Sequence, residues 1–316
     1  MELTGFHHLT AVSARIRDNL QFYTEVMGMR LVKRSVNQDD VSAYHLFYAD
    51  RIGTPGTDLT FFDWPARPER RGTRSVVRTG LRVEGEESLQ WWVERLTDAG
   101  VETSGVVEQG TRSLVEFEDP EGQRLALVDD GGIGDPPEIW PASPVPARHQ
   151  VRGLGPITMS VPELEPSHEV LTGVMSMTPA GEYEMRNQHG VVHIYRMGGK
   201  GPHAELHVAV QPHLQVARLG AGGVHHVAFR TPDDDEYRGW ADRLVEMGVP
   251  NSGPVNRFYF QSLYFREPGG ILFEIATDGP GFTVDEAEET LGEEVALPPF
   301  LEPRRAQIVA GLEPLE

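Results

Sequence analysis

The spacing of apolar residues divides the chain into short segments in which strands surround a single helix. Alternating apolar and polar positions predict strands, whereas apolar residues three or four positions apart predict a helix. In the first segment, a strand over 6–12 precedes a helix from about Asn19 to Met27, which Asp18 is expected to cap and Gly28 to end. Three further strands are predicted at 30–35, 42–49 and 58–64. The first 64 residues therefore predict one compact unit with the order β-α-β-β-β.

The same order of elements returns three times, with varying clarity. The second unit is predicted to contain a strand at 81–83, a helix at 86–99, and strands at 113–118 and 123–128. The third unit is predicted to contain strands at 156–161, 191–196 and 204–210, and a short helix near 167–173. The fourth unit is predicted to contain a strand from Gly223, a helix at 234–247, and strands at 258–260, 262–265 and 271–276.

Proline marks both the turns and the organisation of the chain. The stretches 119–122 and 267–270 each place an acid, Pro and Gly between two strands, because Pro fixes φ and Gly supplies a positive φ. A Pro-rich linker over 133–150 separates two halves. We therefore expect an N-terminal half over 1–132 and a C-terminal half over 151–280, with two βαβββ modules each. The tail over 281–316 is acidic and Pro-rich, and a helix at 283–291 is expected in it.

Composition narrows the classes of function. The 28 Lys and Arg residues against 48 Asp and Glu residues give a net charge of −20, which argues against nucleic acid or an anionic membrane as partner. No cysteine is present, so disulfides and thiolate metal sites are excluded, and His, Asp and Glu are left as metal ligands. No signal peptide or long apolar run is apparent, so a cytoplasmic protein is expected. A homo-oligomer is compatible with the sequence.

Two paired histidines stand at equivalent places in the first and fourth units, in Gly5–Thr10 and Gly223–Phe229. Adjacent strand residues point to opposite faces, so only one histidine of each pair is expected to face a shared site. His8 shares its face with Thr10, whereas His7 shares its face with Leu9. The same alternation favours His226 over His225.

A carboxylate in an apolar strand completes a candidate metal site. Glu274 lies among the apolar residues of 271–276, where a buried charge needs a partner or a metal. Two imidazoles and one carboxylate form the ligand set of non-haem Fe(II) oxygenases. The second unit has Ala126 where Glu274 would stand, and Leu81 and Val83 where a histidine would stand. Units one and four are therefore expected to close one cup between them.

A second histidine and glutamate cluster is an alternative metal site. His203, Glu205 and His207 alternate along one predicted strand and would share a face. The simpler interpretation is a polar strand face opposite an apolar one.

Several segments resemble a known family. They are Gly5–Thr10, Phe22–Lys33, Tyr44–Tyr48, Gly53–Phe62, Gly223–Phe229 and Arg266–Ala276. With these segments the chain resembles the vicinal oxygen chelate superfamily and, within it, the ring-cleaving hydroquinone dioxygenases. The resemblance implies an α+β fold with two cup-shaped mixed-sheet barrels and helices outside.

The resemblance also implies the site and its chemistry. The metal would be Fe(II), held by His8, His226 and Glu274, and Mn(II) accepts the same ligands. The substrates would be a small aromatic diol, a hydroquinone or catechol, and O2. Outer roles in the site would fall on His7, Thr10, His225, Arg257 and Tyr264.

Chemistry suggests a part for most of these outer residues. Tyr264 would hydrogen-bond the substrate oxygen, and one hairpin register places it opposite Glu274. Arg257 would stabilise an anionic oxygen or orient a histidine. His7 and His225 suit proton transfer near neutral pH.

Two other classes of function remain open at this stage. A glyoxalase-type isomerase or thiol transferase on the same scaffold would commonly use four protein ligands, but Phe61 and Phe62 stand where a second carboxylate would be wanted. A metal-free binding or resistance protein would tolerate loss of the three ligands. Phe61, Phe258 and Tyr259 are candidate pocket aromatics.

Overall fold

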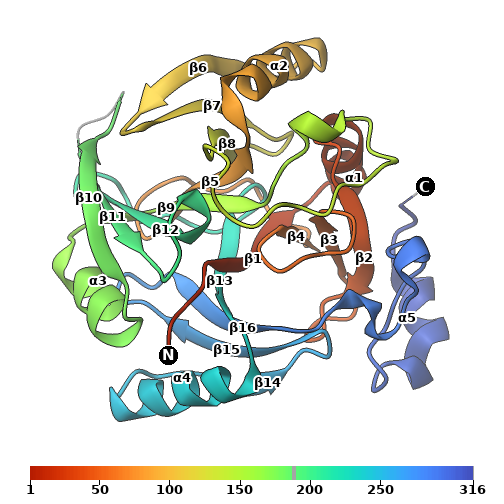
Figure 1. Ribbon diagram of the computed structural model, residues 1–316. Helices are drawn as coiled ribbons and strands as arrows, with labels where there is room; N and C mark the ends of the chain where they lie inside the picture. Colours follow the sequence, from red (N-terminus) through yellow and green to blue (C-terminus); the bar gives the residue numbers. More distant parts are fainter. Residues whose placement is uncertain (187–189, 316) are drawn as a thin grey trace.

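The computed structural model describes residues 1–186 and 190–315, and its strands form two curled eight-stranded sheets (Figure 1). The first sheet runs, in spatial order, through β14 (Val255–Asn256), β15 (Phe260–Arg266), β16 (Leu272–Pro280), β13 (Val224–Thr231), β1 (Phe6–Ser13), β4 (Asp58–Asp63), β3 (Tyr44–Ala49) and β2 (Arg30–Val36). The second sheet runs through β10 (Thr178–Glu184), β11 (Val191–Arg196), β12 (Glu205–Val210), β9 (Leu154–Val161), β5 (Ser75–Val83), β8 (Arg124–Asp129), β7 (Arg112–Glu118) and β6 (Thr103–Gln109).

Each sheet joins two units from different parts of the chain. The first sheet pairs the first unit with the fourth through antiparallel β1 and β13. The second pairs the second unit with the third through antiparallel β5 and β9. Within each unit the first strand lies parallel to the last strand, as β1 does to β4 and β13 to β16. The predicted α+β fold of four βαβββ modules is therefore confirmed, while the division into two halves along the sequence stays a prediction.

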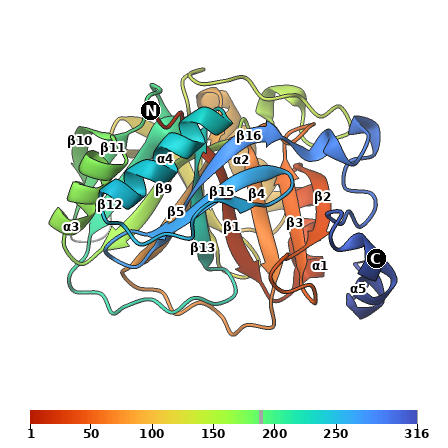
Figure 2. The same cartoon turned by 90° about the horizontal axis from the view of Figure 1, so that it is seen from below.

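The longer helices cover the outer faces of the sheets with matching apolar stripes. α2 (Gly85–Asp98) buries Leu89, Trp92 and Leu96, and α4 (Asp234–Glu246) buries Tyr237, Trp240 and Leu244 at the same spacing. Figure 2 shows α4 lying across β15 and β16. The apolar core therefore lies between helices and sheets, and the concave faces are left for polar residues. Across the two described ranges, no helix has the length and apolar character that a membrane crossing requires.

The first and third units have shorter helices that continue into single π-helical turns. α1 (Ile16–Gln21) continues into η1 (Phe22–Val26), and α3 (Glu165–Glu169) continues into η3 (Val170–Val174). The predicted cap at Asp18 is wrong, because the helix begins at Ile16. Asp18 lies in its first turn and pairs with Arg15 at 3.0 Å.

The strand predictions failed where the sequence lacks alternation. The edge strands β6 and β10 are largely polar and half-exposed, and no pattern predicted them. β5 begins at Ser75, six residues before the predicted start at Leu81. The strand predicted at 258–260 does not form, because Phe258 has a φ of +73°.

The C-terminal tail is anchored by charge. The predicted helix at 283–291 is replaced by two short turns, η5 (Phe282–Val284) and η6 (Glu288–Thr290). Lys33 on β2 is fully buried and pairs with Glu286 and, at 2.8 Å, with Asp285. These two carboxylates therefore hold the tail against β2, in the segment where a helix was predicted. The remaining helical elements are η2 (Ala147–His149), η4 (Pro202–Ala204), η7 (Glu302–Arg304) and α5 (Arg305–Gly311).

Candidate metal centre

Two histidines and a glutamate far apart in the sequence converge where β1, β13 and β16 lie side by side. Nε2 of His8 lies 3.3 Å from Oε2 of Glu274, and Nε2 of His226 lies 3.0 Å from the same oxygen. The two Nε2 atoms are 3.2 Å apart. All three side chains are buried, and within the described ranges they form the one group of three such residues whose ligand atoms lie within 4.8 Å of one another. Together they could hold a single ion.

Strand register explains this convergence. Thr10 on β1 lies opposite His226 on β13, and Ala228 on β13 lies beside Glu274 on β16. Because side chains alternate along each strand, His8, His226 and Glu274 all point to the concave face of the first sheet. The structure thus brings the three predicted residues together, and their role as ligands stays a proposal.

The three residues fit a divalent cation. Oε1 of Glu274 accepts a hydrogen bond from Ser262 at 2.5 Å, but Oε2 is buried without a hydrogen-bond donor. Burial alone would raise the pKa of Glu274, but His8 and His226 outweigh it and hold the pKa well below its usual range. A buried carboxylate oxygen facing two imidazole nitrogens is an arrangement that a metal ion would satisfy.

His7 lies behind His8 and fixes its orientation. Burial, with His8 beside it, lowers the pKa of His7 to about 3, so the ring is neutral. Its Nε2 donates to the carbonyl of Thr277 at 2.9 Å, so its Nδ1 can only accept. Nδ1 of His8, 2.9 Å away, therefore donates to it, and Nε2 of His8 is left with a free lone pair. This is the tautomer that a metal ligand needs.

His225 holds the same position relative to His226. Burial, with His226 beside it, lowers the pKa of His225 to about 3. Its Nδ1 lies 2.8 Å from Nδ1 of His226 and can accept a hydrogen bond from it. Neither His7 nor His225 lines the hollow at the site, so the geometry favours positioning over the predicted proton transfer.

A chain of hydroxyl and imidazole groups extends from the site along the concave face. Oγ1 of Thr10 lies 3.0 Å from Nε2 of His226 and 2.7 Å from Oγ1 of Thr60. Nε2 of His45 on β3 lies 2.9 Å from the same Thr60 oxygen. Burial holds the pKa of His45 well below its usual range, so this imidazole is neutral.

Tyr264 and Arg257 form the opposite side of the site. Tyr264 lies opposite Glu274 in the β15–β16 ladder, so the hairpin has the register that places these two residues together. Its ring lies 5.9 Å from the ring of His226, and its hydroxyl accepts a hydrogen bond from Nε of Arg257 at 3.2 Å. Arg257 also pairs with Asp39 at 2.9 Å. A cation therefore lies beside the hydroxyl of a tyrosine that lines the site.

A small hollow of about 50 Å³ opens onto these groups. Besides Tyr264, the Phe and Tyr residues that line it are Phe47, Phe62, Tyr259 and Phe260. The predicted pocket residue Phe61 is wrong, because it packs on Tyr23 and Tyr48 on the other side of the sheet. Phe258 does not line the hollow either.

The place of a fourth protein ligand is taken by a hydroxyl. Thr60 lies beside Thr10 in β4 as Glu274 lies beside Ala228 in β16, so Thr60, and not Phe61 or Phe62, occupies the position equivalent to the glutamate. A threonine is no substitute for a carboxylate ligand. The first unit therefore supplies one candidate ligand, His8, and the site keeps room for substrates.

The alternative cluster on β12 is not a metal site. Glu205 is bound by Arg112 at 2.6 Å and by Arg196 at 3.0 Å. His203 lies in η4 outside the strand, and Nε2 of His207 is 3.6 Å from Glu205. Arginines already neutralise this carboxylate, so it has little charge left for a metal.

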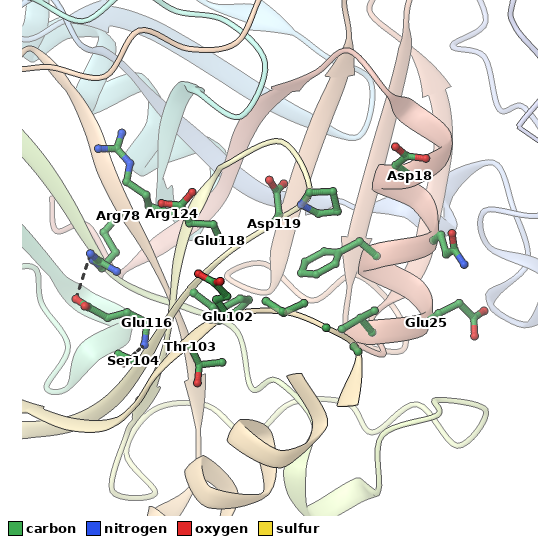
Figure 3. Close-up of a pocket in the computed structure, with 18 of the residues that line it drawn as sticks. Asp18, Glu25, Arg78, Glu102, Thr103, Ser104, Glu116, Glu118, Asp119 and Arg124 are labelled. Atoms are coloured by element: carbon green, nitrogen blue, oxygen red, sulfur yellow. Dashed lines mark hydrogen bonds and ion pairs between the residues drawn. The ribbon is translucent and has the colours of Figure 1, made fainter. Parts of the chain in front are cut away.

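A larger hollow of about 940 Å³ lies away from the candidate ligands (Figure 3). It separates α1 and η1 from β6 and β7, and charges of both signs line it, including Glu25, Arg78 and Glu102. None of the predicted site residues lines it.

Ser262 and His45 are among the residues of the site that sequence reasoning missed. Ser262 donates to Glu274, and His45 lines the hollow. His45 alternates with buried Leu46 on its strand, which is the signal that could have placed it on the concave face. Ser262 depends on a cross-strand register that the sequence does not fix.

Comparison with known proteins supports the same family. The family model described as the glyoxalase/bleomycin resistance protein/dioxygenase superfamily matches residues 5–127 and 153–275. The "Putative ring-cleaving dioxygenase MhqA" of Bacillus subtilis (strain 168) is 45% identical over 320 residues, covering 100% of both chains. The chlorohydroquinone/hydroquinone 1,2-dioxygenase of Sphingobium indicum is 29% identical over 313 residues, covering 94% of this chain and 92% of that one.

A solved structure supports the fold. A crystal structure of a "putative dioxygenase" from Bacillus subtilis superposes with a TM-score of 0.90 at 34% identity, covering 100% of this chain and 98% of the other. The chain therefore belongs to the glyoxalase/bleomycin resistance protein/dioxygenase superfamily. Its first and fourth units supply the candidate metal centre.

Proposed function

We propose that this protein is a metal-dependent ring-cleaving dioxygenase that acts on a hydroquinone or a catechol-like aromatic diol. Fe(II) is the proposed metal, and Mn(II) is the alternative that the same ligands accept. The observation that carries the proposal is the buried convergence of His8, His226 and Glu274. The relatives named as ring-cleaving and hydroquinone dioxygenases support this activity.

His8, His226 and Glu274 would hold the metal, and His7 and His225 would keep the two imidazoles in the required orientation. A bound Fe(II) with open positions would supply the route by which the ring reduces O2. Both oxygen atoms enter the product as one ring carbon–carbon bond breaks, so the reaction needs no external reductant.

The remaining residues of the site would bind the diol and manage its protons. The hydroxyl of Tyr264, held by Arg257, can donate to a substrate oxygen and stabilise negative charge on it. Neutral His45 can accept a proton from a substrate hydroxyl. Phe47, Phe62 and Phe260 form apolar walls that suit an aromatic ring and exclude water.

The direct test combines anaerobic purification, metal analysis and an oxygen electrode. The protein reconstituted with Fe(II) is expected to consume one O2 per hydroquinone and to yield a ring-opened acid. His226→Ala should lose both bound metal and turnover, whereas His193→Ala, a half-buried histidine on β11 of the second sheet, should keep both.

Other outcomes point to the alternative classes. Anaerobic conversion of a methylglyoxal–thiol adduct would identify an isomerase. Ligand binding without bound metal or turnover, unchanged in His226→Ala, would identify a metal-free binding protein. Either result would overturn the proposal.

A further inference from the structure

The second sheet has a concave face equivalent to the one that carries the metal centre. In the first sheet Thr10 lies opposite His226, and in the second sheet Thr158 lies opposite Arg78 through the same antiparallel junction. Arg78 therefore occupies the position of His226. The expectation that Leu81 and Val83 stand there is wrong, because both side chains are fully buried in the core.

Two further positions of the second concave face also differ from their equivalents in the first. Gly80 lies beside Ala126 as Ala228 lies beside Glu274, so alanine replaces the glutamate. Glu116 lies opposite Ala126 as Tyr264 lies opposite Glu274. Arg78 and Glu116 form an ion pair at 3.1 Å, which Figure 3 shows. The second concave face has thus exchanged a candidate metal site for a guanidinium group.

Positive charge exceeds negative charge at this face. Glu116 is shared between two guanidinium groups, because it also pairs with Arg186 at 3.4 Å. The described residues that line the two adjoining hollows here include one carboxylate, Glu116, and five arginines, of which Arg71, Arg124 and Arg112 are paired with Glu118, Glu69 and Glu205 outside the lining. Arg78 and Arg186 share Glu116 alone, so one positive charge is left in a chain with a net charge of −20, and it would attract an anion.

Polar groups also converge on the floor of the hollow. The side-chain amide of Gln109 donates to Tyr183 at 2.9 Å, and the Tyr183 hydroxyl lies 3.0 Å from Nδ1 of His207 and can donate to it. His207 is 5% exposed, and its Nε2 faces the carboxylate of Glu205 at 3.6 Å. The hydroxyl of Tyr183 and the side-chain amide of Gln109 are therefore the polar groups that the hollow offers beside Arg78.

The shape of the hollow favours an organic anion. The outer part has a volume of about 610 Å³ and the inner part about 30 Å³, and both are lined by Arg78, Gln109, Thr158 and Tyr183. Apolar residues complete the inner wall, namely Leu114, Ala126, Val128 and Pro156. Apolar walls with a few convergent polar groups are typical of sites for small organic molecules.

We propose that the concave face of the second sheet binds a small organic carboxylate. Arg78 contacts the carboxylate, which completes the charge balance of the two arginines that share Glu116. Gln109 and Tyr183 contact polar groups on the body of the ligand. This site is separate from the metal centre and does not depend on the dioxygenase activity.

The test is a ¹⁹F NMR titration of the full-length protein with 4-fluorobenzoate, and with neutral 4-fluorobenzamide as the control ligand. Saturable binding of the carboxylate, and weaker binding of the amide, is expected. Arg78→Gln should weaken carboxylate binding by about tenfold or more, because a charge-assisted contact is lost. Tyr183→Phe should weaken it less. Arg238→Gln, which removes an exposed arginine from α4, should leave it unchanged.

Two further measurements make the result decisive. His226→Ala should bind 4-fluorobenzoate as the wild type does, and Arg78→Gln should keep ring-cleavage turnover, which shows that it is folded. Unchanged binding in Arg78→Gln would overturn the proposal. So would loss of binding in His226→Ala, or binding of inorganic phosphate without binding of the benzoate.

Discussion

Nε2 of His8 and Nε2 of His226 lie 3.2 Å apart although 218 residues separate them in the chain. The antiparallel pairing of β1 with β13 creates this contact, and the parallel neighbour β16 adds Glu274. The candidate metal centre therefore depends on the junction between the first and last units. A change that weakens this junction should lower metal affinity while the second sheet stays folded.

His7 is expected to act through His8. His7→Ala removes the acceptor that holds His8 in its tautomer, so Fe(II) affinity should fall by about 10- to 100-fold. Turnover per bound iron should fall less than affinity. A competition titration with a metal chelator measures the affinity, and His193→Ala is the matched control. Unchanged affinity in His7→Ala would contradict the positioning role.

His45 is expected to act on the substrate and not on the metal. His45→Ala should retain iron, because the side chain contacts Thr60 and none of the three candidate ligands. Its kcat should fall by about 100-fold, which is typical for loss of a general base. Metal analysis and steady-state kinetics on the same preparation separate the two effects. Loss of iron together with activity would show that His45 is structural.

Tyr264 is expected to stabilise the bound diol. Tyr264→Phe removes the hydroxyl that Arg257 holds, while the ring beside His226 is kept. The value of kcat/KM for hydroquinone should fall by about tenfold or more, with iron content unchanged. The matched comparison is Tyr44→Phe, at the start of β3, which is expected to leave kcat/KM near the wild-type value. Equal kinetics of Tyr264→Phe and the wild type would remove the tyrosine from the mechanism.

Glu205 is expected to make stability depend on acid pH. Burial would raise its pKa, but contacts with His207 and Arg112 outweigh burial, and Arg196 adds to them, so the pKa is held well below its usual range. A carboxyl with a depressed folded-state pKa stabilises the protein above its unfolded pKa of about 4.3, and this contribution is lost as the pH falls further.

The measurement is urea unfolding at a series of pH values. Below about pH 4.3, the wild-type free energy of unfolding should fall more steeply than that of Glu205→Gln, by up to about 1.4 kcal/mol per pH unit. Glu302→Gln, which removes an exposed carboxyl, should follow the wild-type slope much more closely. Parallel slopes for the wild type and Glu205→Gln would show that the carboxyl has no depressed pKa.

The repeated units and the choice of the three candidate ligands were predictable, because both depend on local patterns. Two His-His pairs at equivalent repeat positions and one acid in an apolar strand, read with strand alternation, were enough to select His8, His226 and Glu274. The rest depends on pairing between strands. His45, Ser262 and the equivalence of Arg78 with His226 appear only once register is known.

Long-range ion pairs explain why the helix predicted in the C-terminal tail does not form. Lys33 looks like one more polar position of a strand, but in the fold it is the buried anchor of Asp285 and Glu286. No pattern within the tail could show that its acids would bind a residue some 250 positions earlier.

The most direct test of the proposed centre is a crystal of protein purified and reconstituted with Fe(II) under anaerobic conditions, measured at the iron absorption edge. One anomalous peak is expected, bound by Nε2 of His8, Nε2 of His226 and a carboxylate oxygen of Glu274, and it should be absent in Glu274→Gln. An iron peak elsewhere in the molecule, or an undiminished peak in Glu274→Gln, would contradict the assignment.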